Sequence, residues 1–375
     1  MRLLFVCPDM HRGGAERQWA TLVPALARRG ADVRLVCLYD EGPLFAEVRA
    51  AGVAAECLGL RGPGDVRGLR RALAESAGRP GAVVTRTVSP QLIGQAIASR
   101  AGAVHVFNEH TPLTAEGELL AMPPRQRLLT RVVAPRVDRV IAVSERQAAP
   151  LVRLGYRRER IVTVPNGVFR EDADTNADRD ETRGSIGLAE SDFAVLCLAN
   201  LRPEKGVDAF AEAVAQARAE GDRARGEGAR ELRGLIAGDG PERERLERLV
   251  EGLDGVELLG SRGDVADLIA ACDALALLSE AEALPMSILE AMAQGRPVVT
   301  SDVGGAVEAV ADGVTGIIVP PGDTAAAAAA LVRLAADPAR AREMGERGRT
   351  RQRERFDGEA MVDGYWRALE EVATR

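Results

Sequence analysis

The sequence has 375 residues, of which 46% are hydrophobic and 28% charged, which suits a globular protein with two ordinary domains. Aromatic residues are 3% of the chain and are not interleaved with basic ones, so no nucleic-acid partner is expected. The net charge of −7 combines a surplus of nine positive charges in residues 1–168 with a surplus of sixteen negative charges in residues 169–375. The basic half suits an anionic partner such as a phosphate or a charged membrane, or it is a charge-segregated surface without a partner.

The first half of the chain alternates short apolar runs with amphipathic stretches. The opening run, residues 2–7, is too short for the core of a signal peptide and predicts a buried strand. An amphipathic helix follows over 14–29, with Trp19 and Leu22 on its apolar face. Further strands are expected in the runs DVRLVCL, AVVTRT, VHVFNEH, DRVIAVS and IVTVP. Strands that alternate with helices predict a parallel sheet covered on both faces.

The polar, acidic stretch 169–184 interrupts this alternation and is expected to be a linker. The alternation then restarts, so we expect one domain over 1–168 and a second over 185–356. Strands of the second domain are expected in FAVLCLAN, LRGLIAGDG, VELLG, ALALLS, PVVTS and TGIIVPPGD. A final helix is expected over about 357–375. Its apolar side, which must pack against another part of the protein, carries Met361, Tyr365, Trp366 and Leu369.

Two features bear on the compartment. The longest uncharged apolar run, 325–332, falls short of the roughly 18 residues that a membrane span needs, so we expect a cytoplasmic protein. The five cysteines form no CxxC pair and lie mostly in apolar runs. This pattern favours buried thiols in a reducing compartment over disulfides or a metal site.

The chain contains a single lysine, Lys205, among 48 arginines. It lies with Asn200 and Arg202 in the loop NLRPEKG after an expected strand. Ligands of doubly wound sheets bind beyond the carboxyl ends of the strands. Lysine is a compact charge on a flexible stem, whereas arginine is a planar fork, so a lysine here suits a diphosphate leaving group. The other interpretation is that one lysine arose by chance in an arginine-rich chain.

Two glutamates eight residues apart mark a second candidate site, in the stretch SEAEALPMSILEAMAQGRPVV. Glu282 falls in the loop after an expected strand, and Glu290 falls one turn into a helix that begins near Pro285. Together the carboxylates could accept hydroxyl hydrogen bonds from two parts of one ligand. Amides at the start of the same helix suit a phosphate, and they belong to Leu284, Met286 and Ser287. Alternatively Glu290 lies on a solvated helix face, although its apolar flanks argue against that.

Two weaker signals lie in the first half. Gly13 and Gly14 separate the first strand from the first helix, where backbone amides can approach an anion, but the spacing is not the GxGxxG of dinucleotide-binding proteins. His110 follows an expected strand and suits a contact to a sugar. His105 lies within that strand and suits a structural role.

Together these motifs resemble the retaining glycosyltransferases of family 4, which have the GT-B fold. The matching pieces run through nearly the whole chain and are GGAERQ, NEHTP, AVSE, VPNGV, LRPEKG, GDGPE, the stretch from Ser279 to Val299 and DVGG..E.V.DG.TGIIVPPGD. The resemblance implies an α/β protein of GT-B type, with two Rossmann-like, doubly wound domains facing a cleft that takes a nucleotide-sugar. It also implies that the C-terminal helix crosses back to the first domain.

The resemblance assigns roles to the candidate residues. Lys205, with Arg202 as its arginine partner, would neutralise the departing diphosphate in place of a metal ion, and no cofactor is implied. Glu290 would hold the ribose hydroxyls, and Glu282 and His110 would contact the sugar. Other donor-binding positions would be Gly13, Gly14, Asn200, Gly238, Leu284, Pro285, Met286 and Ser287.

The sequence departs from the family pattern at two positions. Many relatives have arginine where this chain has Asn200, and Arg202 would replace it if the loop is extended, since residues i and i+2 then point the same way. Glycine usually follows the first glutamate of the motif, where this chain has Ala283. If that position needs a positive φ, alanine carries a penalty of roughly 1 kcal/mol or more.

The sequence therefore predicts a metal-independent, retaining glycosyltransferase that uses a nucleotide-diphosphate sugar. The alternatives are a nucleotide-sugar epimerase of the same fold and a non-catalytic nucleotide-sugar-binding partner subunit; a nicotinamide dehydrogenase is disfavoured. The acceptor (a glycan, a lipid-linked sugar or a small molecule), the base and the sugar stay open. The basic, partly apolar segment 123–140 either docks on the inner face of an anionic membrane or is a helix with a solvated basic face.

Overall fold

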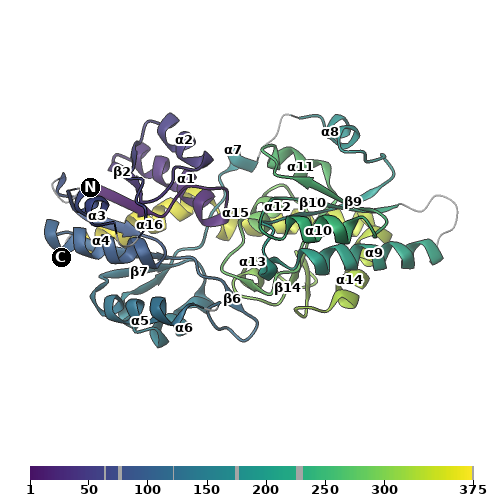
Figure 1. Ribbon diagram of the computed structural model, residues 1–375. Helices are drawn as coiled ribbons and strands as arrows, with labels where there is room; N and C mark the ends of the chain where they lie inside the picture. Colours follow the sequence, from purple (N-terminus) through teal and green to yellow (C-terminus); the bar gives the residue numbers. More distant parts are fainter. Residues whose placement is uncertain (63–64, 75–77, 121, 174–176, 225–230, 374–375) are drawn as a thin grey trace. The chain divides into compact units, whose positions relative to one another are not determined.

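The structure of the protein is a computed structural model that describes residues 1–375 except 63–64, 75–77, 121, 174–176, 225–230 and 374–375 (Figure 1). The chain divides into two compact units. The first unit comprises Met1–Pro112, Gly117–Gly167 and Gly358–Arg375, and the second comprises Leu113–Glu116 and Val168–Asp357. The last helix thus belongs to the first unit.

The first unit is built on a parallel sheet with the strand order β3-β2-β1-β4-β5-β7-β8. Its strands are β1 (Arg2–Cys7), β2 (Asp32–Cys37), β3 (Ala54–Cys57), β4 (Ala82–Thr85), β5 (Val104–Glu109), β7 (Arg139–Ala142) and β8 (Ile161–Thr163). Its helices are α1 (Gly14–Arg28), α2 (Pro43–Ala50), α3 (Val66–Ala74), α4 (Val88–Ala101), α5 (Pro124–Val133), α6 (Ala148–Arg153) and α16 (Gly358–Ala373), with 3-10 turns at Ala134–Arg136, Glu145–Gln147 and Arg158–Arg160. The edge strand β3 was not expected, because it contains no large apolar residue and half of its residues are exposed.

The second unit repeats this plan with the strand order β11-β10-β9-β12-β14-β15. Its strands are β9 (Phe193–Leu198), β10 (Leu232–Ala237), β11 (Val256–Gly260), β12 (Ala274–Leu277), β14 (Val298–Ser301) and β15 (Gly316–Val319). A separate antiparallel pair joins β6 (Leu113–Thr114) to β13 (Ala281–Glu282). Its helices are α7 (Arg170–Ala173), α8 (Arg179–Ser185), α9 (Val207–Ala224), α10 (Arg243–Val250), α11 (Val265–Ala271), α12 (Met286–Ala293), α13 (Ala306–Ala309), α14 (Thr324–Ala336) and α15 (Pro338–Arg355), with a 3-10 turn at Pro203–Lys205.

Each unit is doubly wound, which confirms the fold class expected from the alternation of strands and helices. In both sheets the first and fourth strands of the unit are neighbours, β1 with β4 and β9 with β12. The chain reverses its direction of winding between these two strands, and ligands of such sheets bind at the carboxyl ends there.

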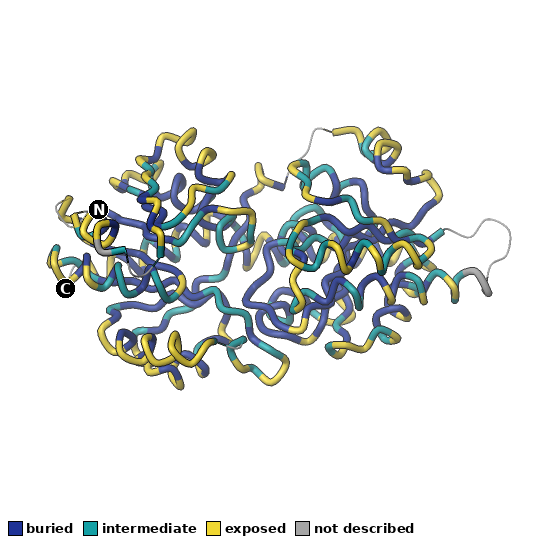
Figure 2. The backbone as a smooth tube through the Cα atoms, in the orientation of Figure 1, coloured by how far each residue is buried: buried dark blue, intermediate teal, exposed yellow. Residues whose placement is uncertain are grey.

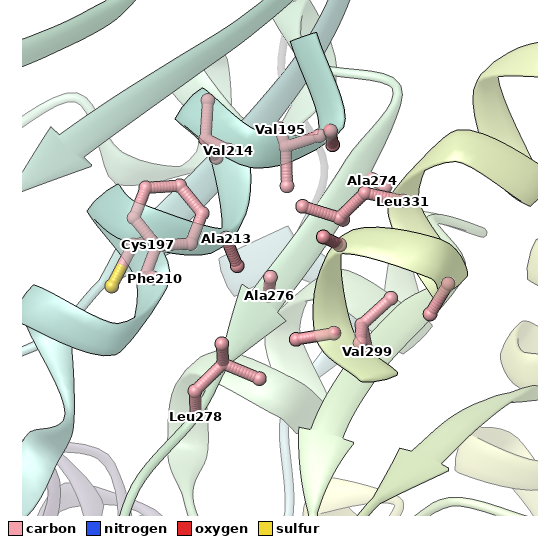
Figure 3. Close-up of a cluster of buried hydrophobic side chains, with 14 of the residues drawn as sticks. Val195, Cys197, Phe210, Ala213, Val214, Ala274, Ala276, Leu278, Val299 and Leu331 are labelled. Atoms are coloured by element: carbon pink, nitrogen blue, oxygen red, sulfur yellow. The ribbon is translucent and has the colours of Figure 1, made fainter. Parts of the chain in front are cut away.

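The core of the second unit lies between its sheet and the helices α9 and α14 (Figure 3). Val195 and Cys197 alternate along β9, so both project to the same face, where they meet Phe210 of α9. Ala276 of β12 and Leu331 of α14 complete this layer. Figure 2 shows that the strands are buried and that the outward-facing parts of the helices are exposed. Complete burial of a side chain such as Phe210 contributes about 1.5–3 kcal/mol to stability.

The segment expected to be a linker, 169–184, is instead part of the second unit. It contributes α7 and most of α8, and α8 packs against α11. The reason is Arg183, a buried side chain that donates to the carbonyls of Ala271 and Asp192, each at 2.8 Å. It also pairs with Asp273 at 3.3 Å. An arginine that anchors a polar segment in this way is not visible from composition.

The C-terminal helix α16 packs against α1 and β7 within the first unit (Figure 1). The Tyr365 hydroxyl accepts a hydrogen bond from Gln18 at 2.8 Å, and Arg29 lies over the ring of Trp366. Tyr365 is fully buried, whereas Trp366 is only half-buried. The apolar side of α16 is therefore centred on Met361, Tyr365 and Leu369.

Candidate functional site

The loops that follow β9 and β12 meet at the carboxyl edge of the second sheet, and they bring the lysine and the first glutamate together. Lys205 Nζ lies 2.7 Å from Glu282 Oε1. The hydroxyl of Ser279 donates to the same carboxylate oxygen at 2.8 Å. The Glu282 side chain is 5% exposed and that of Lys205 is 21% exposed. The Lys205 side chain is thus fixed by a buried carboxylate while part of that side chain faces solvent.

The backbone holds both loops in place. Gly206, at φ +57°, ends the 3-10 turn that carries Lys205, and a Cβ there would lie 2.0 Å from the carbonyl oxygen of Leu278. The amide of Glu280 donates to the carbonyl of Glu204 at 2.9 Å. A larger residue at 206 would push the two loops apart. The sequence LRPEKG therefore places its lysine against the β12 loop through the glycine that follows it.

Glu282 is also held from the other side. It lies in β13, opposite Leu113 of β6. Gly304 packs on its carbonyl group, and the amide of Gly305 donates to the carbonyl of Ala283 at 2.8 Å. β6 and this glycine pair were given no role in the sequence analysis, because contacts between distant loops are not visible in one sequence. Ser279 lies only three residues before Glu282, and its hydroxyl was given no role there either.

Glu290 lies in the second turn of α12, which begins after Pro285. It is half-buried, between the buried residues Leu289 and Ala291. Pro285 provides no side-chain hydrogen bond to the start of the helix. Met286 and Ser287, the first two helical residues, follow it at this end. Leu284 is buried just before the helix.

Ala283 does not have the positive φ that would have strained an alanine at this position. Among the described residues other than glycine, positive φ values occur at Arg79 and Thr87. Ala283 is buried and adopts an ordinary backbone conformation. The departure from glycine at this position therefore does not distort the loop that carries Glu282.

The suggestion that Arg202 replaces an arginine at position 200 assumed an extended loop, and this assumption is wrong. The loop is turned rather than extended, because the amide of Arg202 donates to the carbonyl of Asn200 at 2.8 Å. Arg202 is exposed, and Asn200 is half-buried. Gly238 follows β10 and lies against the same loop, since a Cβ there would lie 1.9 Å from the carbonyl oxygen of Ala199. A role for Arg202 in diphosphate binding stays a prediction.

In the first unit, the predicted residues lie at the carboxyl edge of its own sheet. Gly13 caps α1 without a side-chain hydrogen bond, and Gly14 is the first residue of the helix. Arg86, which the sequence analysis missed, follows β4 and is 1% exposed. Its guanidinium donates to the carbonyl of Asp9 at 2.6 Å and pairs with Glu16 at 2.8 Å. Arg86 therefore ties the glycine-containing loop to the centre of the sheet.

His110 directly follows β5, as expected. Its Nε2 lies 2.9 Å from Oδ1 of Asn108. Burial and the nearby Arg86 lower the pKa of His110 to about 3, so the imidazole is neutral at physiological pH. His105, within β5, is fully buried and hydrogen-bonded to Thr85 and Gln95, which is a structural role.

The stretch 123–140 comprises α5, a 3-10 turn and the first residues of β7. Leu128, Leu129 and Val132 are exposed on α5, and Leu128 retains 65% of its accessible surface. Arg125, Arg127 and Arg131 are exposed on the same helix. Arg139 is not part of this basic surface, because it is buried in β7 and paired with Glu371 at 2.8 Å.

The strand orders and the clustered loops define a pair of Rossmann-like units of the GT-B type. Residues 12–171 match the family model described as Glycosyltransferase Family 4, and residues 192–337 match the model described as Glycosyl transferases group 1. The Anabaena protein HepE, solved in complex with UDP, is 22% identical and has a TM-score of 0.83 over 99% of this chain and 100% of that one. The chain belongs to the family 4 glycosyltransferases with the GT-B fold, which confirms the resemblance drawn from its motifs.

Curated relatives match part of their length. N-acetyl-alpha-D-glucosaminyl L-malate synthase of Bacillus anthracis is 32% identical over 250 residues, which are 66% of this chain and 63% of that protein. D-inositol 3-phosphate glycosyltransferase of Geodermatophilus obscurus is 33% identical over 284 residues, 72% of this chain and 62% of that protein. In both cases the chain covers less than two thirds of the relative. Among the residues that the structure describes, no helix combines the length and the apolarity that crossing a bilayer requires.

Proposed function

We propose that this protein is a retaining glycosyltransferase that moves a sugar from a nucleotide-diphosphate sugar to an acceptor without a metal ion. The observation that carries the proposal is the ion pair of Lys205 with Glu282 at the carboxyl edge of the second sheet. A half-buried cation held at the point where doubly wound sheets bind ligands suits the diphosphate of a donor.

Lys205 supplies the positive charge that the leaving group needs. Its ammonium group has three N–H donors, and among the residues that the structure describes Glu282 accepts from one of them, which leaves two for diphosphate oxygens. Because the ammonium group is already positioned, it stabilises the developing negative charge without reorganising during the reaction. Arg202, exposed on the same loop, adds a second positive charge near the phosphates.

Glu282 and Glu290 recognise the two hydroxylated parts of the donor. The second oxygen of the Glu282 carboxylate faces the sugar, and Glu290 accepts hydrogen bonds from the ribose. The start of α12, at Met286 and Ser287, favours the negative charge between these two parts. Leu284, Pro285 and Gly238 line the donor, and Asn200 contacts it from the lysine loop.

The names of the relatives support the finer parts of the proposal. HepE was solved with UDP, which favours a uridine nucleotide. The Bacillus anthracis relative is named for an alpha-linked N-acetylglucosaminyl product. If the sugar is alpha-linked both in the nucleotide-sugar donor and in the product, the reaction retains the configuration at the anomeric carbon. The same names, malate and inositol phosphate, favour a small anionic acceptor.

The experiment is a thermal-shift screen with UDP, GDP and ADP on four forms of the protein. The wild type should be stabilised by one nucleotide, and Lys205→Ala and Glu290→Ala should lose most of this shift. Glu280→Gln is the matched control, because Glu280 lies in the same loop as Glu282 but is exposed. Stabilisation of all three variants to the wild-type extent would remove the donor-site assignment.

The alternatives differ in what they produce. An epimerase of the same fold would convert a nucleotide-sugar without any acceptor. A non-catalytic partner subunit would bind the donor but would not turn it over with any acceptor. The ordinary backbone at Ala283 removes one of the two reasons for the second alternative, and the turned loop at Asn200 leaves the other. Product analysis with and without malate or inositol phosphate separates the three.

We also propose that α5 attaches the protein to the inner face of an anionic membrane. Leu128 and Val132 lie one turn apart and are 65% and 54% exposed, and exposed arginines flank them. An amphipathic helix with leucines to insert and arginines to contact lipid phosphates suits an anionic bilayer surface. The inward side of α5, at Thr130 and Val133, is buried, so the exposed side is available to a partner.

Co-sedimentation with vesicles tests this attachment. The wild type should sediment with phosphatidylglycerol vesicles and less so with phosphatidylcholine vesicles or at high salt. Leu128→Ser with Val132→Ser should abolish sedimentation. Leu69→Ser, at an exposed leucine of α3, is the control and should leave it unchanged. Equal sedimentation of the wild type and the double variant would exclude α5 as the attachment site.

A further inference from the structure

Asn108 has only one possible amide orientation. It is fully buried in β5, and its Oδ1 accepts a hydrogen bond from the indole Nε1 of Trp19 at 2.7 Å. Its Nδ2 donates to the carbonyl of Ile141 at 3.2 Å. An indole N–H can only donate and a carbonyl can only accept. If the oxygen and nitrogen of the Asn108 amide were exchanged, its NH₂ group would face the indole N–H and its oxygen would face the carbonyl of Ile141, so neither hydrogen bond could form.

This orientation decides which nitrogen of His110 carries the proton. The Asn108 Oδ1 has two lone pairs, one of which accepts from Trp19. His110 Nε2 lies 2.9 Å from the same oxygen, so Nε2 must be the N–H that fills the other. In a neutral imidazole Nδ1 then has a bare lone pair. Within the described part of the chain no hydrogen bond is formed by that nitrogen, and the His110 residue is partly exposed.

We propose that Asn108 is a positioning residue that holds His110 as the Nε2–H tautomer, so that His110 Nδ1 accepts a hydrogen bond from a hydroxyl group of a sugar substrate. The tautomer follows from the geometry alone, whereas the hydroxyl partner rests on the proposed function. The charged neighbour of His110 is Arg86, which opposes protonation of the ring.

The C-terminal helix supports the same arrangement. Tyr365 of α16 neighbours Asn108 and accepts a hydrogen bond from Gln18 of α1. Trp19, the next residue on α1, is fully buried and packs edge-on against Phe5 with the ring centroids 4.9 Å apart. The indole donor is therefore fixed by packing, and it fixes the amide of Asn108 in turn.

His105 provides an internal reference with the opposite tautomer. Its Nδ1 lies 2.9 Å from Oε1 of Gln95, whose amide nitrogen donates to Ser99. With the Gln95 amide in this orientation, Nδ1 of His105 is the N–H, and its Nε2 accepts from the hydroxyl of Thr85 at 2.9 Å. The chain contains one further histidine, the exposed His11, so the ring resonances can be assigned one by one.

The first experiment is nitrogen-15 NMR of the full chain labelled at the histidine rings, with His105→Gln and His110→Gln for assignment. At pH 7.5 we expect an unprotonated Nδ1 for His110 and an unprotonated Nε2 for His105. Trp19→Phe, which removes the indole donor and keeps an aromatic ring, should give His110 a mixture of tautomers. A protonated Nδ1 at His110 in the wild type would overturn the proposal without any reference to ligand or activity.

The second experiment introduces a carboxylate beside each histidine. Asn108→Asp should make His110 titrate closer to neutral pH, so that Nδ1 gains a proton and turnover of the nucleotide-sugar donor falls in acid. Gln95→Glu places a carboxylate beside His105, and the pH profile of turnover of this variant should match that of the wild type. If NMR shows that His110 is protonated in Asn108→Asp and turnover is undiminished, the hydroxyl-accepting role is wrong. If Asn108→Asp does not fold by circular dichroism, turnover by Trp19→Phe, expected to fall about tenfold or more, decides the same question.

Discussion

Gly304 lies directly on the carbonyl group of Glu282: a Cβ at position 304 would lie 1.6 Å from that oxygen. The same hypothetical atom would lie 3.3 Å from the carbonyl oxygen of Leu113, which faces Glu282 across the β6–β13 pair. The first glutamate of the motif is therefore held by two backbone neighbours that come from distant parts of the sequence. These contacts hold the backbone of Glu282 in the position from which its side chain reaches Lys205.

Replacing Gly304 by alanine should move Glu282 and weaken donor binding. Gly304 has φ +44° as well as the close contact, whereas Gly313 has φ +68° and nothing within 4 Å. Gly313→Ala should therefore lose only about 1–2 kcal/mol of stability from backbone strain. Gly304→Ala should lose more, and should also lose nucleotide affinity. Urea unfolding and nucleotide titration measure both, and equal losses in the two variants would contradict the close contact.

The stability of the protein should fall in acid partly because of His105. Burial lowers the pKa of His105 to about 3 in the folded protein, against about 6.5 in an unfolded chain. Between these values the unfolded state binds the additional proton, so the free energy of unfolding falls as pH decreases. His105→Gln should reduce this slope by up to about 1.4 kcal/mol per pH unit.

Urea unfolding at pH 7, 6 and 5 checks the His105 prediction. His11→Gln is the control for replacing a histidine, because the His11 side chain is exposed, whereas that of His105 is fully buried. A slope unaffected by His105→Gln would show that this imidazole is protonated in the folded protein.

The thiols of the second unit should resist modification in the native protein. Burial raises the pKa of Cys197 and of Cys272 to about 12, and both side chains are inaccessible. Cys57, which is half-buried at the sheet edge, should react first. Timed labelling with iodoacetamide at pH 8 and peptide mapping would show the order. Rapid labelling of Cys197 would mean that the β9–α9 core opens readily.

Turnover should not depend on a divalent metal ion. The proposal assigns the charge on the leaving diphosphate to Lys205 and Arg202, so EDTA should leave the rate within about twofold of the untreated enzyme. The measurement is nucleotide release from the selected donor with EDTA and after addition of Mg²⁺ or Mn²⁺. A rate that EDTA abolishes and a metal restores would contradict a lysine-based mechanism.

Much of the fold could be predicted because its signals are local. The buried strands of both sheets are short apolar runs, and the amphipathic helix over α1 shows its apolar side at Trp19 and Leu22. The strand β3 was missed because an exposed edge needs no apolar run, as its residues Ala54 to Cys57 show. The supposed linker was misjudged because one buried side chain, Arg183, holds a polar segment in place.

The candidate site divides in the same way. Lys205 and Glu282 could be found from their positions after strands, and the structure brings them to 2.7 Å. Arg86 and Asn108 could not, because their roles depend on partners that lie far away in sequence, such as Asp9 for Arg86 and Trp19 for Asn108. Spacing along one chain indicates which strand end a residue occupies, but not which buried polar groups it meets there.

The most direct test compares Lys205→Ala with Lys205→Arg in donor turnover and nucleotide affinity, with circular dichroism to confirm folding. If Lys205 stabilises the negative charge on a departing diphosphate, a compact cation is required beside Glu282. We therefore predict a loss of about 100-fold or more in turnover for alanine and an incomplete rescue by arginine. Near-normal turnover by folded Lys205→Ala would show that this lysine does not stabilise the leaving group.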